Sequence, residues 1–281
     1  MPSGVIDLHL HTTASDGANE PAALVDLAWR AGIRTMSVTD HDTIAGIRAA
    51  AAQAAESGIV FVAGIEITAV LGERDIHMLG YYVDADSAPL NVFLQSQRAD
   101  RIRRVNAMMD RLAALGKPID RDAVLADGET GNGRAIGRPM VAKALVQAGH
   151  VADIRQAFDE WIGDGRAAYV PRRGATPSEV ITIVSQAGGI TSLAHPGLLR
   201  RDDLIPGLVD AGLAALEAYH SDHDARTTGH YLGLAGRYDL AVSGGSDYHS
   251  EEGHRKGALG HVGLPPEHFE KLSARANEGT R

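Results

Sequence analysis

Hydrophobic and polar residues alternate in two different periods along the first 83 residues. Short apolar or period-two runs predict strands, whereas apolar residues spaced three and four positions apart predict amphipathic helices. The segment 19–31 illustrates the second pattern, with Leu24 and Leu27 on its apolar face and Pro21 near its first turn. We expect helices at 19–31 and 43–56, and strands at 5–10, 35–39, 59–68 and 75–83.

The same rhythm returns in the last third of the chain. We expect helices at 177–187, 203–211 and 224–237, and strands at 189–194, 214–219 and 240–244. Seven strands, mostly separated by helices, are typical of parallel βαβ units in an α/β fold. A closed or nearly closed barrel is favoured over an open sheet, because residues suited to catalysis follow several different strands.

The middle of the chain breaks this rhythm. Residues 91–166 have no strand signal, and their pattern predicts helices at 91–115, 137–149 and 151–161 around a glycine-rich hinge at 128–134. We therefore expect a barrel formed by 1–90 and 167–281 and a helical insertion, 91–166, that serves as a lid or substrate subdomain. The polar tail, 273–281, is expected to fray.

Composition narrows the functional classes. A chain of 281 residues suits one α/β barrel, and its net charge of −9 argues against binding along a long nucleic acid. The chain has no cysteine, so imidazole and carboxylate groups must hold any metal, which favours Mn, Mg, Fe or Zn in an open catalytic site. The sequence has neither a signal-like N-terminus nor an apolar run of membrane-spanning length. We expect a cytoplasmic protein with no membrane association, and no protein partner is predicted.

The clearest chemical signal is the segment Asp7-Leu8-His9-Leu10-His11. Period-two alternation places Asp7, His9 and His11 on one face of the first strand, with leucines on the other. Two imidazoles two residues apart can bind one metal ion, and Asp7 could orient one of the rings. A chance polar face is the alternative, but three polar residues inside a barrel would then have no purpose.

Further candidate side chains lie in a loop or within and just after the other predicted strands. Because the carboxyl ends of barrel strands meet at one face, we expect these residues to converge there. Three of them have ordinary alternatives, since Asp42 could cap the next helix and His77 and His195 could each be a satisfied core histidine. The candidates are Asp16, Asp40, His41, Asp42, Glu66, His77, His195, Glu217, Asp247 and His249.

This ordered set resembles the polymerase and histidinol phosphatase (PHP) family of metal-dependent phosphoesterases. The motifs that carry the resemblance are His9-x-His11, Thr39-Asp40-His41-Asp42, Glu66, His195-Pro196 and Ser246-Asp247-x-His249. The resemblance implies a distorted (β/α)7 TIM-like barrel with two or three divalent ions, Mn²⁺ being expected and Mg²⁺, Fe²⁺ or Zn²⁺ being alternatives. Asp16 stands where many relatives have histidine. The implied ligand sets are His9, His11, Glu66 and Asp247 for one ion, Glu66, His77 and His195 for a second, and Asp16, His41 and His249 for a third.

Residues 12–17, the segment Gly137-Arg138-Pro139 and the helical insertion are most similar to one branch of that family, the 3′,5′-nucleoside bisphosphate phosphatases. The resemblance implies removal of the 3′-phosphate from adenosine 3′,5′-bisphosphate to leave AMP, and some members of the branch also degrade short RNA from its 5′ end. The candidate catalytic residues are His195, His223 and Asp40, with His220 a further candidate acid. The candidate substrate-binding residues are Arg134, Arg138, Arg172, Arg173 and His223.

Three other functions, two catalytic and one non-catalytic, are compatible with parts of this pattern. Related amidohydrolase barrels also begin with His-x-His, but many bridge their metals with a carbamylated lysine, and none of the lysines here follows a predicted strand. A non-catalytic metal-binding domain should have lost ligands, whereas every position that can be matched here holds a competent one. A phosphatase for histidinol phosphate or another small phosphomonoester would share the chemistry and differ in substrate.

Overall fold

The computed structural model describes residues 4–72, 74–129, 136–252 and 256–279. Within these residues seven strands form one sheet in the order of the sequence, and six of the strands run in the same direction along it. The fourth strand is antiparallel to both of its neighbours, which departs from a purely parallel βαβ arrangement. The strands are β1 (Val5–Asp7), β2 (Ile33–Val38), β3 (Val60–Leu71), β4 (Arg74–Tyr81), β5 (Ile190–Leu193), β6 (Ala215–His220) and β7 (Ala241–Gly245).

The sheet curls into a TIM-like barrel, and within the described part of the chain no continuous strand ladder closes it. The edge strands β1 and β7 are joined instead by backbone hydrogen bonds around and just beyond their ends. Leu8 donates to Gly244 at 3.1 Å, Asp247 donates to His9 at 2.8 Å, and His11 donates to Tyr248 at 3.0 Å. The chain after β1 is therefore held directly beside the chain after β7, and both segments carry candidate metal ligands.

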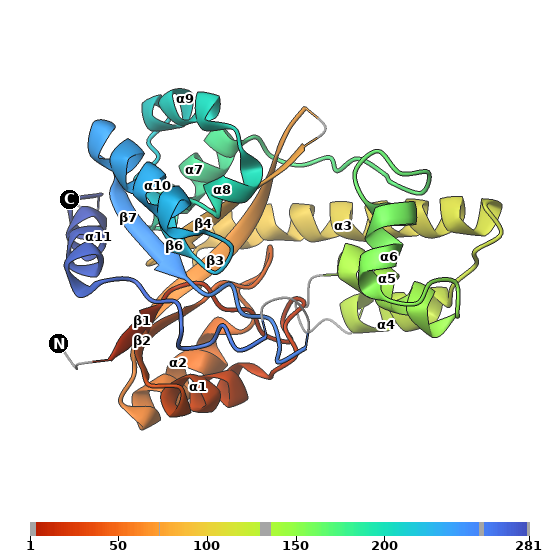
Figure 1. The fold of residues 1–281 in the computed structure, drawn as a ribbon, viewed down its shortest axis with the longest axis horizontal. Coiled ribbons are helices and arrows are strands. Elements are labelled where there is room, and N and C mark those ends of the chain that lie inside the picture. Colours follow the sequence, from red (N-terminus) through yellow and green to blue (C-terminus); the bar gives the residue numbers. More distant parts are fainter. Residues whose placement is uncertain (1–3, 73, 130–135, 253–255, 280–281) are drawn as a thin grey trace.

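Helices cover the barrel on two sides, with α1 and α2 on one side and α7, α9 and α10 on the other (Figure 1). Their apolar stripes supply much of the core, and a capping box between Thr176 and Glu179 fixes the start of α7. These helices are α1 (Pro21–Arg30), α2 (Ile47–Ser57), α7 (Pro177–Gln186), α8 (Pro196–Leu199), α9 (Ile205–Asp210), α10 (Ala225–Arg237) and α11 (Pro266–Gly279), with a 3₁₀ turn, η2 (Asp202–Leu204), before α9.

The expected frayed tail is wrong for residues 273–279, because they belong to α11. Phe269, Leu272 and Ala276 lie three and four positions apart and are buried in the main core. Two residues of this apolar stripe, Phe269 and Leu272, precede the polar segment that was expected to fray, and they hold the helix against the barrel.

The insertion forms a second apolar cluster, separate from the barrel core, beside the outer half of the long helix α3 (Figure 1). Its elements are α3 (Ala88–Ala114), α4 (Arg121–Glu129), α5 (Arg138–Gln147), α6 (Ile154–Ala157) and a π-helical turn, η1 (Phe158–Ile162). The helix α4 was not expected, and it contains Gly128, the first residue of the expected hinge. The rest of that hinge after Glu129 lies outside the described residues. No helix among the residues that the structure describes is long and apolar enough to cross a membrane.

Candidate metal centre and active site

Seven imidazoles and four carboxylates converge at the barrel face where β1, β2, β5 and β7 end. Since β4 runs antiparallel, it brings its first residues, rather than its last, to this face. Six of the converging residues are nine-tenths or more buried, and the other five are partly exposed: His77, His195, Asp16, His41 and His249. The converging residues are His9, His11, Asp16, His41, Glu66, His77, His195, Glu217, His220, Asp247 and His249.

Glu66 lies at the centre of this group. Its Oε1 is 2.8 Å from Nδ1 of His77 and 3.2 Å from Nε2 of His195. Burial would raise the pKa of Glu66, but the surrounding imidazoles hold that pKa well below its usual range, so the carboxylate stays ionised. Its Oε2 lies 3.2–3.3 Å from a ring nitrogen of each of three further histidines, His9, His11 and His41.

Asp247 forms the second point of convergence. Its Oδ1 is 3.1 Å from Nε2 of His11, 3.4 Å from Nε2 of His9 and 3.4 Å from Nδ1 of His249. Its Oδ2 is 3.3 Å from Nε2 of His220. The backbone of Asp247 has a φ of 51°, in the left-handed region that non-glycine residues adopt uncommonly and aspartate more often than most. The side chain reaches the cluster from this left-handed turn.

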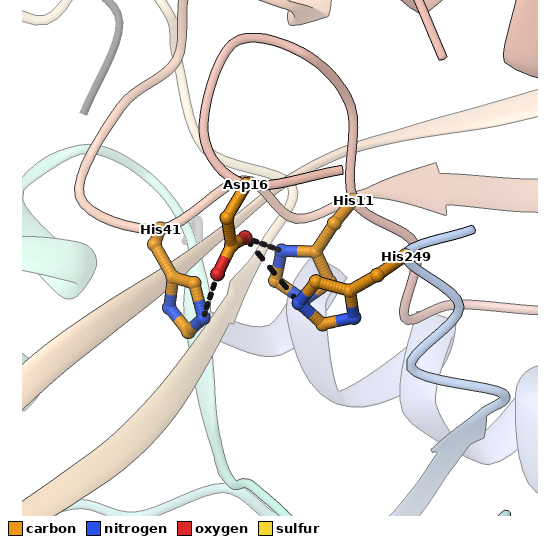
Figure 2. A group of neighbouring side chains, drawn as sticks. All are labelled: His11, Asp16, His41 and His249. Carbon is orange, nitrogen blue, oxygen red and sulfur yellow. Dashed lines mark ion pairs between the residues drawn. The ribbon is translucent and has the colours of Figure 1, made fainter. Parts of the chain in front are cut away.

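Asp16 forms a third group with histidines from three other segments (Figure 2). Its Oδ1 is 3.3 Å from Nε2 of His249 and 3.7 Å from Nδ1 of His11, and its Oδ2 is 3.9 Å from Nε2 of His41. The rings of His11 and His249 stack with centroids 4.1 Å apart. The structure thus brings together the three residues that were expected to hold a third ion.

The spacing of these donor atoms fits shared metal ions. Two ligands about 2.1 Å from one ion lie roughly 3.0–3.4 Å apart at octahedral or tetrahedral angles. The contacts around Glu66 Oε2 and Asp247 Oδ1 span 3.1–3.4 Å, which is within that range. Neither ring nitrogen of His11 makes a hydrogen bond of ordinary geometry among the described residues, although Nε2 lies within 3.2 Å of both Asp247 and Glu66. A divalent cation would satisfy them and balance the buried carboxylates.

His11 also has the electrostatic character of a cation site. Burial lowers the pKa of its imidazole, but the carboxylates of Asp247 and Glu66 outweigh that effect and raise the pKa to about 10. A ring that holds a proton this strongly lies in a strongly negative field. A metal ion can take the place of that proton.

Two aspartates near the cluster have contacts that differ from those expected. Asp7 orients no ring, because its Oδ1 accepts the backbone N–H groups of His9 at 3.2 Å and Ser246 at 2.9 Å. The expectation that the Asp7 carboxylate orients a histidine ring was therefore wrong. Glu217 contacts such a ring instead, with Oε1 2.8 Å from Nδ1 of His9.

Asp40 lies beneath the loop that carries Asp16. Its Oδ1 accepts the backbone N–H of Thr12 at 2.8 Å and the hydroxyl of Ser15 at 2.7 Å, and its Oδ2 accepts the hydroxyl of Thr12 at 2.7 Å. Both oxygens are thus used to order the 12–17 loop. These contacts place Asp40 in support of a ligand rather than at the reacting atoms.

Two cavities meet the cluster on different sides and share Asp75, His77 and Arg138. The larger measures about 470 Å³ and the smaller about 150 Å³. The larger is lined by His77 and His195, by Arg74, Asp75, Arg138 and Asp164, and by Gly165, Tyr169, Ala194, Leu198 and Leu199. The smaller extends toward the insertion and includes Asp16, His41, Arg101, Arg104, Arg138 and Arg172 in its lining.

The candidate arginines have different surroundings. Arg138 lines both cavities and contacts Asp164 at 2.6 Å. Arg172 lines the smaller cavity and is buried against Asp42, with Nη2 2.5 Å from Oδ2. Arg173 is exposed and lines a different cavity beside α3. Arg134 lies outside the described residues.

Asp42 does not cap the following helix, because α2 begins at Ile47 with Gly46 at its N-cap. Its carboxylate instead contacts both Arg172 and Arg101, the latter at 2.6 Å. The sequence reasoning missed Arg101 and Arg104. Their spacing of three positions on one face of α3 was the available signal.

Both ring nitrogens of His223 face backbone groups. Nδ1 is 2.9 Å from the carbonyl oxygen of Ala218, and Nε2 is 3.2 Å from the backbone N–H of Gly197. Nδ1 must therefore donate while Nε2 accepts. In this arrangement His223 has no ring nitrogen directed at the cavities and supports the turn after His195.

Comparison with known proteins agrees with this geometry. The PHP domain family model matches residues 7–131. The chain is 33% identical over 270 residues to a 3′,5′-nucleoside bisphosphate phosphatase of Chromobacterium violaceum, with 93% of each chain covered. It is also 33% identical to a phosphoribosyl 1,2-cyclic phosphate 1,2-diphosphodiesterase of Eggerthella lenta, covering 92% of this chain and 97% of that protein. A 5′-3′ exoribonuclease of Haemophilus influenzae is 39% identical over 192 residues, 68% of each chain.

A solved structure extends the similarity to nearly the whole chain. A candidate metal-dependent phosphoesterase of Bifidobacterium adolescentis superposes with a TM-score of 0.87 at 34% identity, covering 98% of this chain and 97% of that one. The likeness therefore includes the helical insertion as well as the barrel. The expected resemblance is confirmed, and the chain belongs to the PHP domain family of metal-dependent phosphoesterases.

Proposed function

We propose that this protein is a cytoplasmic, Mn²⁺-dependent phosphatase that removes the 3′-phosphate from nucleoside 3′,5′-bisphosphates. The observation that carries the proposal is the pair of arginine-lined cavities that meet at the imidazole–carboxylate cluster and share Arg138 and His77. Such a substrate needs one phosphate at the metal centre and a second phosphate recognised by a cation at a fixed distance. The Chromobacterium relative named for this activity matches along 93% of the chain.

The proposed ligand sets are those that the family resemblance implies. His9, His11, Glu66 and Asp247 would hold one ion, Glu66, His77 and His195 a second, and Asp16, His41 and His249 a third. Divalent ions bound there would lower the pKa of a coordinated water and neutralise charge on the phosphoryl oxygens. The chain's own contribution is to position the substrate and to exclude water around it.

The larger cavity suits the nucleoside part of this substrate. Its volume of about 470 Å³ lies within the range of small-molecule sites. Ala194, Leu198 and Leu199 form an apolar wall next to His195, where a ribose and a base can pack. Arg138 extends between the two cavities and would hold the phosphate that is not hydrolysed.

Release of the ribose oxygen requires a proton, and His195 is the best placed of the three candidate acids. His195 lines the larger cavity. His220 faces Asp247 through Nε2 and accepts the backbone N–H of Asp222 through Nδ1, and both nitrogens of His223 face backbone groups. We therefore assign the protonating role to His195 rather than to His223, acting through Nδ1 because its Nε2 faces Glu66 in the second ligand set, and a loop-ordering role to Asp40.

The decisive assay measures phosphate release by Mn²⁺-loaded protein from adenosine 3′,5′-bisphosphate, with AMP, 3′-AMP and histidinol phosphate alongside. We expect preferred conversion of the bisphosphate to AMP. Activity only on histidinol phosphate, or equal rates on all four compounds, would refute the substrate assignment.

The assignment of Arg138 is tested with the same assay. Arg138→Met should reduce the preference for the bisphosphate over 3′-AMP. Only the bisphosphate has a second phosphate that Arg138 can bind, so only this substrate loses a contact in the variant. The matched control is Arg48→Met, since Arg48 forms an exposed pair with Asp86 and neither residue lines the two cavities. Equal loss of activity on both substrates would contradict the role of Arg138.

Short RNA is the second candidate substrate. A further cavity of about 140 Å³ lies beside Asp16, lined by Lys143 and by residues of α4 and α5, so space adjoins the cluster on the side away from His195. A chain of several nucleotides needs room on both sides of the bond that is cut. Stepwise release of mononucleotides from a 5′-phosphorylated trinucleotide would support this activity, and an intact trinucleotide after full conversion of the bisphosphate would exclude it.

A further inference from the structure

The buried carboxylate of Glu217 contacts two of the expected metal ligands at once. Glu217 lies in the middle of β6 and has no exposed surface. Its Oε1 is 2.8 Å from Nδ1 of His9, and its Oε2 accepts the backbone N–H of His195 at 2.7 Å. His9 and His195 belong to different ligand sets and follow different strands, so one side chain links two parts of the metal centre.

We infer that Glu217 is a positioning residue that orients the imidazole of His9 and the turn of His195 together, and so couples the two metal sites that share Glu66. The inference rests on the metal centre of the proposed function and not on the identity of the phosphorylated substrate. It assigns Glu217 no contact with either ion.

The first half of this role is to fix the tautomer of His9. A carboxylate only accepts hydrogen bonds, so Nδ1 of His9 must donate to Glu217. The lone pair of the neutral ring is then on Nε2, which lies 3.3 Å from Glu66 and 3.4 Å from Asp247. A ring nitrogen held by an acceptor on one side is the usual support for a metal-bound histidine.

The second half of the role concerns the backbone of His195. This residue has a φ of 28°, a positive value that non-glycine residues seldom adopt. It also precedes Pro196, and a residue before proline favours an extended backbone. A strained residue persists where its surroundings fix it. The hydrogen bond from His195 N–H to Glu217 is one such restraint, and it holds the ring with Nε2 3.2 Å from Glu66.

The partners of Glu217 argue against a role as a metal ligand. Its two contacts measure 2.8 and 2.7 Å, which are hydrogen-bond lengths. One partner is a backbone N–H, and the other is Nδ1 of His9, whereas Nε2 of that ring faces Glu66 and Asp247. Both oxygens of Glu217 are thus already used by donors of the protein.

The test is Mn²⁺ binding to metal-free protein carrying Glu217→Gln, measured by calorimetric titration. The amide can accept one of the two hydrogen bonds through its oxygen but presents N–H to the other donor. We expect affinity at both Glu66-sharing sites to fall by about 10- to 100-fold, as for other residues that support metal-binding histidines. Glu217→Asp keeps the charge on a shorter side chain and should bind with intermediate affinity.

The matched control is Ser243→Ala. Ser243 pairs with Glu217 across β6 and β7, is equally buried, and contacts Ser192 at 2.7 Å rather than any expected ligand. It should keep the wild-type Mn²⁺ affinity. Wild-type affinity in Glu217→Gln, weakening of only one site, or equal weakening in Ser243→Ala would each overturn the inference. Circular dichroism verifies that the variants fold, and Glu217→Asp provides the comparison if the glutamine variant does not. Because this readout needs no substrate, failure of the bisphosphate assay would leave it interpretable.

Discussion

The ion pairs of Asp42 allow a sharp test of how the insertion is held to the metal centre. Its Oδ2 contacts Arg101 of α3 at 2.6 Å and Arg172 at 2.5 Å, and its Oδ1 accepts the backbone N–H of Thr68 at 2.9 Å. The carboxylate is fully buried, and the Arg172 side chain is only 2% exposed. Asp42→Asn preserves the shape and leaves two guanidinium groups without a counter-charge.

Breaking a buried ion pair by removing one partner costs about 3–5 kcal/mol of unfolding free energy. For a chain of this size, that corresponds to a fall in Tm on the order of 6–20 °C, at about 2–4 °C per kcal/mol. The measurement is urea and thermal unfolding of metal-free protein, so that any effect on metal binding is kept apart. Asp86→Asn is the control, because the Arg48–Asp86 pair is about three-quarters exposed and should contribute less than about 1 kcal/mol.

The pH dependence of the same variant has a defined sign. Burial raises the pKa of Asp42, but Arg172 and Arg101 more than offset this and hold it well below the unfolded value of 3.8. The contribution of Asp42 to stability is therefore fully present above that unfolded value and is lost only as the pH falls toward the depressed folded value. The stability gap between wild type and Asp42→Asn should be constant from pH 6 to 8. A gap below about 1 kcal/mol at pH 7, or one that changes across this range, would refute the reasoning.

Three further predictions address the metal centre and the C-terminal helix. Asp247→Asn should abolish turnover while circular dichroism shows an intact fold, and near-normal activity would mean that the assigned cluster is wrong. Mn²⁺ binding at pH 7 should release a proton, because the pKa of His11 is raised to about 10 in the metal-free protein; a binding enthalpy independent of the buffer's ionisation enthalpy would contradict this. Leu272→Ala should cost about 2–5 kcal/mol in urea unfolding, since Leu272 anchors α11 in the core, and an unchanged midpoint would show that α11 is dispensable.

Much of the candidate metal centre could be predicted because strand periodicity and metal chemistry impose local constraints. His9 and His11 are two residues apart, so one face of the chain after β1 must present both. The rule that functional residues follow barrel strands then collects His41, His195 and Asp247 at the same face. These positions needed no knowledge of contacts between distant segments.

The supporting residues could not be predicted in the same way, because their roles depend on which distant groups they meet. Asp7 and Glu217 are both carboxylates within strands, and either could orient His9. The three-dimensional positions of the two carboxylates decide between them: Asp7 faces the backbone of Ser246, whereas Glu217 faces the ring of His9. His223 likewise resembled a free catalytic histidine until the fold brought Gly197 and Ala218 to its two nitrogens.

The direction of β4 explains why His77 was difficult to interpret from the sequence. In a parallel barrel, a histidine near the start of a strand lies at the face opposite the active site, where it would be a core residue. Here only residues 72 and 73 separate β3 from β4, and Thr68 of β3 pairs with His77 in antiparallel register. The reversal brings the start of β4 to the catalytic face, so that Nδ1 of His77 is 2.8 Å from Glu66 and Asp75 lies in the cavity lining beside Arg138. The absence of a helical pattern between the two predicted strands was the signal for a hairpin, because parallel neighbours need a crossover of a dozen or more residues. The same reversal gives the cavity a wall from β4, which a uniformly parallel barrel would place at the other end of the molecule.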